Sequence, residues 1–146
     1  MIKEYICDKS ASFLVILTLA GCGTPQLYNP NNIDKHELAT LKTEAGKEIF
    51  VTDNYVAWIL YIYDVNHSEI TNRSSLSAKI NEISLPKGVY RIAAECVKRR
   101  YIATPSAVFA IEASKTYEVF CDMIQDENSS GMAVDSKVQL KIKEVK

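Results

Sequence analysis

The sequence has little of what enzymes and nucleic-acid-binding proteins usually need. It holds only two histidines, His36 and His67, and its formal net charge is -1 with charges of both signs. No Gly-x-Ser-x-Gly, His-Glu-x-x-His or phosphate-cradling glycine loop occurs. The mixed charge provides no basic field, which argues against nucleic acid as a partner. We therefore expect a non-catalytic protein without a metal site or a cofactor.

The few clusters of polar residues have simpler explanations than chemistry. His67 stands near Asp64, Asn66 and Glu69, but these residues lack the spacing of a calcium-binding loop. The paired acids Asp126-Glu127 lie in a polar stretch without the apolar surroundings that raise a carboxyl pKa. We interpret both stretches as turns or loops.

Hydrophobic runs long enough to span a membrane are also missing, although a short one lies near the amino terminus. Residues 13–20 form an apolar run of eight residues, which is shorter than the ~20 residues that a spanning helix needs. A polar stretch containing Lys3 and Lys9 precedes it, and Gly21 and Cys22 follow. This order of segments predicts an export signal peptide over residues 1–21 rather than a core helix.

The end of this run resembles the lipobox of bacterial lipoproteins at all four positions, Leu19-Ala20-Gly21-Cys22. The resemblance implies cleavage before Cys22, which then carries lipid as the first residue of the mature protein. A lipid with several acyl chains is a stable membrane anchor. Gly23 stands where an aspartate often signals inner-membrane retention. For a Gram-negative source, the resemblance therefore implies the outer membrane, on its periplasmic side.

Removing residues 1–21 leaves 125 of the 146 residues, which is enough for one domain. Residues 22–36 contain Pro25 and Pro30 without periodicity, so we expect a lipidated amino terminus and a flexible tether there. Residues 37–146 are expected to form the domain. Leu27 and Tyr28 could enter the lipid interface or dock on the domain, and the sequence does not choose between these alternatives.

Of the four cysteines, Cys7 lies in the predicted signal peptide, and Cys22 carries lipid by the lipobox resemblance. The other two, Cys96 and Cys121, form an even pair in an oxidising compartment. Both alternate with apolar residues in the pattern of an inward-facing strand position, which is what a disulfide between core strands requires. The in-phase neighbours are Tyr90, Ile92 and Ala94 before Cys96, and Tyr117, Val119 and Met123 around Cys121. We predict a disulfide, with two buried free thiols as the alternative.

After residue 36 the hydrophobic period becomes two, and turn signals separate short apolar runs. Residues 56–63 are apolar in both phases, so we expect a central strand that is covered on both sides. The carboxy-terminal run alternates with lysines, which predicts a solvent-facing and protected edge. The expected strands are 49–52, 56–63, 79–85, 89–97, 107–113, 116–124 and 138–143.

About seven short strands without a convincing helix predict an all-β, antiparallel two-sheet sandwich of the transthyretin or immunoglobulin type. The stretch Ile83-Ser84-Leu85-Pro86-Lys87-Gly88-Val89-Tyr90-Arg91-Ile92 resembles the strand–Leu-Pro-x-Gly–strand hairpin of small envelope domains, including PEGA-type modules. In its turn we expect Gly88 to adopt positive φ. Glu112-Ala113-Ser114-Lys115-Thr116-Tyr117 is similar to a second hairpin of those domains, although no Pro-Glu-Gly-Ala signature is present.

One local concentration of charge remains, Lys98-Arg99-Arg100-Tyr101, in an expected connection over 98–106. It could contact an acidic partner, with Tyr101 adding a stacking face, or it could be a solvated loop. Together these features predict a non-catalytic outer-membrane lipoprotein that serves as an interaction or scaffolding module of a cell-envelope assembly, with an envelope protein as its partner. The alternative is a binding or inhibitor lipoprotein, either glycan-binding or similar to lysozyme inhibitors.

Overall fold

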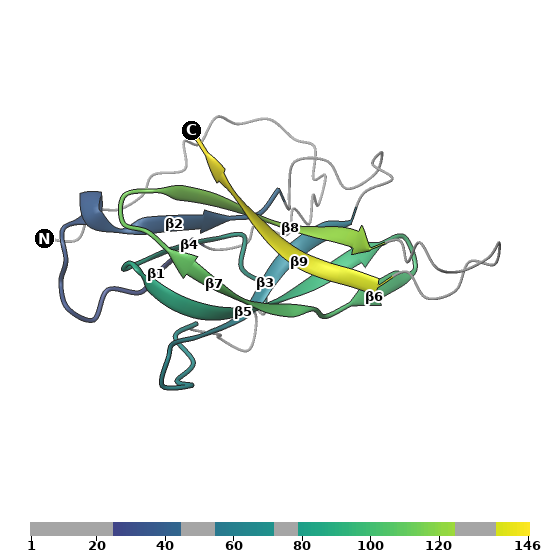
Figure 1. Cartoon of the computed structure of the whole chain (residues 1–146), viewed down its shortest axis with the longest axis horizontal. Helices are drawn as coiled ribbons and strands as arrows, with labels where there is room; N and C mark the ends of the chain where they lie inside the picture. The colour runs from purple at the N-terminus through teal and green to yellow at the C-terminus, as the bar shows by residue number, and fades with distance from the viewer. Residues whose placement is uncertain (1–24, 45–54, 72–78, 125–136) are drawn as a thin grey trace, which may run out of the picture.

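The computed structural model describes residues 25–44, 55–71, 79–124 and 137–146, which form two β-sheets packed as a sandwich (Figure 1). The only helix among these residues is a single 3-10 turn, η1, at Lys35–Glu37. The strands are β1 Gln26–Leu27, β2 Ala39–Lys42, β3 Val56–Tyr63, β4 Glu82–Leu85, β5 Gly88–Lys98, β6 Tyr101–Ala103, β7 Ser106–Ile111, β8 Thr116–Ile124 and β9 Lys137–Val145.

The larger sheet has five strands in the order β1-β4-β2-β8-β9, and we call it the five-stranded sheet. In the four-stranded sheet, β3 pairs with one side of β5, while β7 and β6 pair with successive halves of its other side. The chain passes between the sheets at residue 80, because Ile80 bridges to Ile59 of β3 just before β4 joins the other sheet. The sandwich is not closed into a barrel.

The predicted all-β sandwich is confirmed, and β3 and β8 have the bounds that the sequence pattern gives. Two strand pairs, β1 with β4 and β2 with β8, are parallel rather than antiparallel. The expected strand at residues 49–52 lies outside the described residues, as do the signal segment 1–21 and Cys22. The position of β3 differs from the expectation, since it stands at one side of its sheet and not at the centre.

The core lies between the two sheets and follows the alternation of the strands. Inward-facing residues are aliphatic or aromatic at almost every position, which is the pattern that lets two sheets exclude water from one layer. The largest fully buried side chains are Leu41, Ile59, Ile62, Ile80, Ile83, Leu85, Ile92, Val119 and Cys96.

The expected tether is wrong from residue 26 onward, because this part of the chain belongs to the sandwich. Gln26 and Leu27 pair in parallel with β4, and the Tyr28 amide donates a hydrogen bond of 2.9 Å to the Ser84 carbonyl. Tyr28 packs against the core, while Leu27 is 59% exposed. Pairing with β4 satisfies backbone groups that a free coil would leave to water, which explains why a stretch without periodicity is ordered.

The turn between β4 and β5 needs glycine for a different reason from the one expected. Gly88 does not have a left-handed φ; instead, a Cβ at this position would lie 3.1 Å from the Tyr90 ring. The ring is held there because the Tyr90 hydroxyl donates a hydrogen bond of 2.9 Å to the Pro86 carbonyl. Glycine therefore permits a close approach of the backbone to a buried aromatic side chain.

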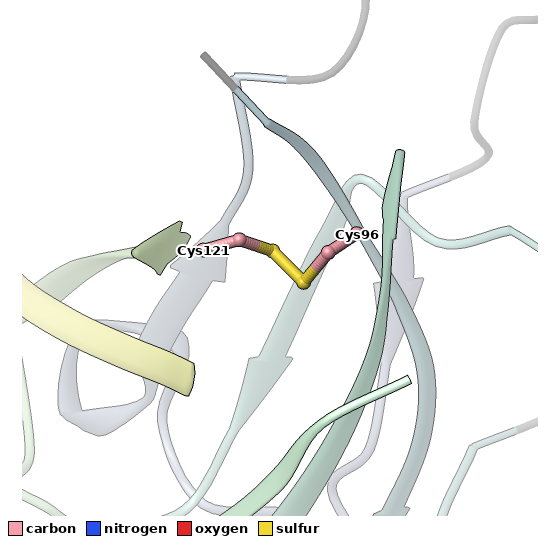
Figure 2. Close-up of a disulfide and its surroundings, with 2 residues drawn as sticks. All are labelled: Cys96 and Cys121. Carbon is pink, nitrogen blue, oxygen red and sulfur yellow. A yellow bond between two sulfur atoms is a disulfide. The ribbon is translucent and has the colours of Figure 1, made fainter. Parts of the chain in front are cut away.

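A disulfide joins Cys96 of β5 to Cys121 of β8 and so links the two sheets, as the sequence pattern predicts (Figure 2). The Cα atoms are 6.0 Å apart, within the usual range for a disulfide. Cys96 is fully buried, so the bond crosses the core itself.

We predict that the double variant Cys96→Ala/Cys121→Ala is less stable than the oxidised protein by about 3–4 kcal/mol, because the disulfide closes a loop of 25 residues in the unfolded chain. Urea titrations of both proteins, with and without reductant, measure this difference. Reductant should lower the stability of the parent protein and leave that of the variant unchanged. Equal stabilities of the oxidised parent and the variant would contradict the structural role of the bond.

We also predict a pH-dependent effect of Tyr90→Phe. Burial, followed by the nearby Tyr28 and Asp64, raises the Tyr90 pKa above its ordinary value of 10.0. The folded state therefore holds the phenol proton more tightly than the unfolded state, and this contribution to stability is lost as the pH rises above about 10. Near neutral pH the variant should be less stable by about 1 kcal/mol, the value of one hydrogen bond.

Urea unfolding of both proteins from neutral to alkaline pH measures the effect. The difference in stability between parent and variant should narrow above about pH 10. A constant or widening difference would show that the Tyr90 phenol is not preferentially protonated in the folded state.

Candidate functional site

The two outer faces of the sandwich differ in character, and the outer face of the five-stranded sheet is adapted to water. Charges of alternating sign cross β4, β2, β8 and β9 in one row, in the order Glu82, Lys42, Glu118 and Lys143. The Lys143 amine lies 2.9 Å from the Glu118 carboxylate, and this hydrogen bond raises the pKa of Lys143. Opposite charges in adjacent cross-strand positions favour the register and suit a solvated surface.

The aromatic ring of Phe120, on the same face, lies beside charged side chains. The Lys143 amine stands 5.4 Å from the centre of the Phe120 ring. The next lysine on β9, Lys141, forms an ion pair with Asp122 and lowers the pKa of that carboxyl. Phe120 is thus bordered by charge.

The outer face of the four-stranded sheet owes its composition to an irregularity in β3. The register of β3 against β5 shifts between Ile59, which pairs with Ala94, and Tyr61, which pairs with Ala93. Leu60 is therefore the extra residue of a β-bulge, and the side-chain alternation reverses at this point. Before the bulge, odd-numbered residues point into the core; after it, the even-numbered Ile62 does.

Because of this reversal, aromatic residues from both phases of β3 point outward. Trp58 pairs with Glu95, Tyr61 with Ala93 and Tyr63 with Arg91, and these three partners occupy the outward phase of β5. We call this surface the aromatic face. Its members from β3, β5 and β7 are Val56, Trp58, Tyr61, Tyr63, Val89, Arg91, Ala93, Glu95, Val97 and Val108.

The two ends of the aromatic face are differently arranged. At one end, the Lys79 amine lies 5.6 Å from the Trp58 ring and forms an ion pair with Glu95. At the other end, the Tyr61 and Tyr63 rings stack with their centroids 6.1 Å apart and an interplanar angle of 16°. The ladder places exposed Arg91 beside Tyr63. This arrangement places aromatic rings and a cation on one surface, which can bind by packing.

The basic segment forms a hairpin, so the expected connection over residues 98–106 is wrong. Lys98 ends β5 and pairs with Tyr101 of β6, which leaves Arg99 and Arg100 as a two-residue turn. Arg99 has a φ of 53°, a left-handed value that costs a non-glycine residue roughly 1–2 kcal/mol. The structure brings Arg99, Arg100 and Tyr101, which is 72% exposed, to one tip. A partner contact at this tip stays a prediction.

The Lys98 side chain is placed apart from the Arg99-Arg100 turn. Its amine stands 5.7 Å from the centre of the Tyr55 ring, next to the start of β3. The basic segment therefore divides into a lysine held over an aromatic ring and an arginine pair at the turn.

The two histidines occupy turns, as the sequence predicts for His67 but not for His36. His67 has a φ of 62°, and the Asp64 carboxylate accepts hydrogen bonds from the Asn66 and Ser68 amides at 2.8 and 2.9 Å. His36 lies in η1, where its amide donates to the Asp34 carboxylate that caps the turn. Within the described ranges, no group of three or more His, Cys, Asp or Glu side chains could hold a metal ion.

The pattern in the sequence pointed to β3 but not to the aromatic face as a whole. Its outward residues from β5 and β7 alternate with core residues and could be found only once the register was known. No helix in the described part of the chain is long and apolar enough to cross a membrane. No family model matches the chain, and no curated protein or solved structure matches it either.

We predict that deleting Leu60 lowers the stability by no more than about 1 kcal/mol, because Ile59 and Tyr61 then pair with Ala94 and Ala93 in a regular ladder that keeps Ile62 in the core and both tyrosines outside. The matched control deletes Ile62, which removes a fully buried side chain and shifts Tyr63 into the inward position, at a cost on the order of 3 kcal/mol. Urea unfolding of the two variants measures the difference between them. Equally large losses in both would show that Leu60 is not the extra residue that lets Ile59 and Ile62 both face the core.

Proposed function

We propose that this protein is a non-catalytic lipoprotein, anchored through Cys22 on the periplasmic side of the outer membrane of a Gram-negative cell. In this proposal, the aromatic face binds a protein partner within a cell-envelope assembly. The observation that carries the proposal is the contrast between the two outer faces of one sandwich. One face carries rows of paired charges, and the other carries part-exposed Trp58, Tyr61 and Tyr63.

The composition of the aromatic face supports binding to another protein. Tryptophan, tyrosine and arginine are the residues that contribute most often to binding energy at protein interfaces. Here they stand on adjacent strands, with Tyr63 beside Arg91 and with small Ala93 beside Tyr61. When a partner packs on these rings, their exposed apolar surface is removed from water, which favours binding.

The ordered amino-terminal segment supports a location close to the membrane. Gln26 is fixed in register with Ile83, so only four residue steps separate Cys22 from a point on the sandwich. Four extended residues span at most about 14 Å. If Cys22 carries the anchor, the domain lies against the membrane surface, and its partner must be reachable there.

A second candidate function is binding of a glycan, or inhibition of an enzyme that acts on one. Stacked tyrosines beside an arginine also suit the apolar faces and hydroxyl groups of a sugar ring. A lysozyme assay with the purified protein separates this candidate from the first, since inhibition that is lost in Tyr61→Ser/Tyr63→Ser would favour it.

We predict that a photo-crosslinking amino acid at Tyr63 captures a discrete partner in the native envelope. The matched control carries the same amino acid at Phe120, on the outer face of the five-stranded sheet. Crosslinking at position 63 should exceed that at position 120 at least several-fold, since only the first lies on the aromatic face.

The same pair of positions is then examined in a Cys22→Ser background. Loss of both the lipid and the crosslinked partner would support an anchored interaction module. Equal capture at positions 63 and 120 would refute the aromatic face as the binding surface. A partner retained in full without the lipid would refute the role of the anchor.

A further inference from the structure

The edges of the two sheets are protected in all but one place within the described residues. β9 carries Lys137, Lys141 and Lys143 along its edge, and β1 is only two residues long. The free side of β3 is partly occupied, because Ile80 bridges to Ile59 and Glu69 to Tyr63. Lysines, short strands and covering segments are the usual ways to stop an edge from pairing with another chain.

The side of the four-stranded sheet formed by β6 and β7 carries no lysine, and β7, with six residues, is longer than β1. Residues 101–111 contain no charged side chain, and the only proline, Pro105, lies between the two strands. Ile102 is 66% exposed and Val108 is 57% exposed. No strand of the described chain pairs with the outer side of β7; β9 passes nearby but pairs with β8.

The hydrogen-bond phase of β7 shows which backbone groups are available. The Ala94 amide donates to the Pro105 carbonyl at 3.1 Å, which makes this the hydrogen-bonded type of antiparallel pair. Pair types alternate along such a ladder. The residues whose N–H and C=O groups point away from β5 are therefore Ser106, Val108 and Ala110, whose side chains are also exposed.

We propose that two copies of this chain pair antiparallel along β7, about a two-fold axis at Val108. Val108 then faces Val108 of the second copy, and Ser106 faces Ala110 of the second copy. The three outward-pointing residues of each strand would form about six interchain hydrogen bonds. The two four-stranded sheets become one continuous sheet, and the two aromatic faces lie on the same side of it.

The chemistry of β7 favours a second copy as its occupant. A two-fold pairing brings identical side chains together, which is costly for charged strands and acceptable for an uncharged one such as Ser-Ala-Val-Phe-Ala-Ile. The nearest charge on this face is Arg91, one strand in from the edge. The two copies of Arg91 would be three strand spacings apart, roughly 14 Å, which exceeds the Debye length of about 8 Å at physiological salt.

The pairing alone buries less surface than a standard protein interface, so we expect a weak and reversible dimer. The inference does not depend on lipidation or on the partner of the aromatic face.

Cysteine crosslinking tests the proposal in the full chain with Cys7 and Cys22 replaced by serine. Under mild oxidation Val108→Cys should form a covalent dimer, because facing residues at the two-fold axis have Cα atoms about 5.5 Å apart. The matched control is Val89→Cys, an exposed valine on the same face of the central strand β5, which should remain monomeric. A mixture of Ser106→Cys and Ala110→Cys should give the mixed dimer in preference to either self-dimer.

Sedimentation from micromolar to near-millimolar concentration supplies the non-covalent measurement. The parent protein should show a monomer–dimer equilibrium, and Val108→Pro should lose it while keeping its urea midpoint, because that N–H is not used in the ladder with β5. Equal crosslinking at positions 108 and 89, or a parent protein that stays monomeric at every concentration, would overturn the proposal. A dimer that survives Val108→Pro would overturn it as well.

Discussion

The β-bulge at Leu60 is the constraint on which the character of this surface depends. A regular ladder between β3 and β5 would place Trp58 on one face and both tyrosines on the other. The extra residue instead lets Ala57, Ile59 and Ile62 fill the core and leaves three aromatic rings outside. One inserted residue thus satisfies the core and creates an aromatic surface from a strand that is apolar throughout.

The rest of the sandwich holds that surface in place. β5 lies between β3 and the β6–β7 side, and the Cys96–Cys121 disulfide ties it to β8 of the opposite sheet. The amino-terminal residues from Gln26 are bound to β4, so the chain leaves the domain from a fixed point rather than from a flexible tether. A binding surface on rigid strands loses little conformational entropy when a partner packs on it.

Much of the fold could be predicted from local patterns, and the reasons for the failures are physical. The runs at 56–63 and 116–124 are rich in apolar residues with strand-like patterns. Their strands and the disulfide partners were therefore predictable. β1 was not, because two residues without periodicity become a strand only through pairing with β4. β6 was not predicted, because the turn before it has Arg99 at a left-handed φ, where a glycine would normally indicate a turn in the sequence.

The aromatic face itself could be only half predicted. The surplus of apolar residues on β3 was visible in the sequence, but a bulge leaves no local signature, so the strand was expected to be covered on both sides and central. The structure places it at one side of its sheet, with Trp58, Tyr61 and Tyr63 turned to the same surface. Register between distant strands decides this, and a single sequence does not contain it.

In the proposed function, the aromatic face is occupied in the cell and the opposite face is not. Hydroxyl-radical footprinting by mass spectrometry, performed on native envelopes and on the purified protein, measures this most directly. We predict that Trp58, Tyr61 and Tyr63 are protected in the envelope while Phe120 is oxidised equally in both samples. Equal oxidation of the three aromatic residues in envelope and solution, or protection at Phe120 instead, would contradict it.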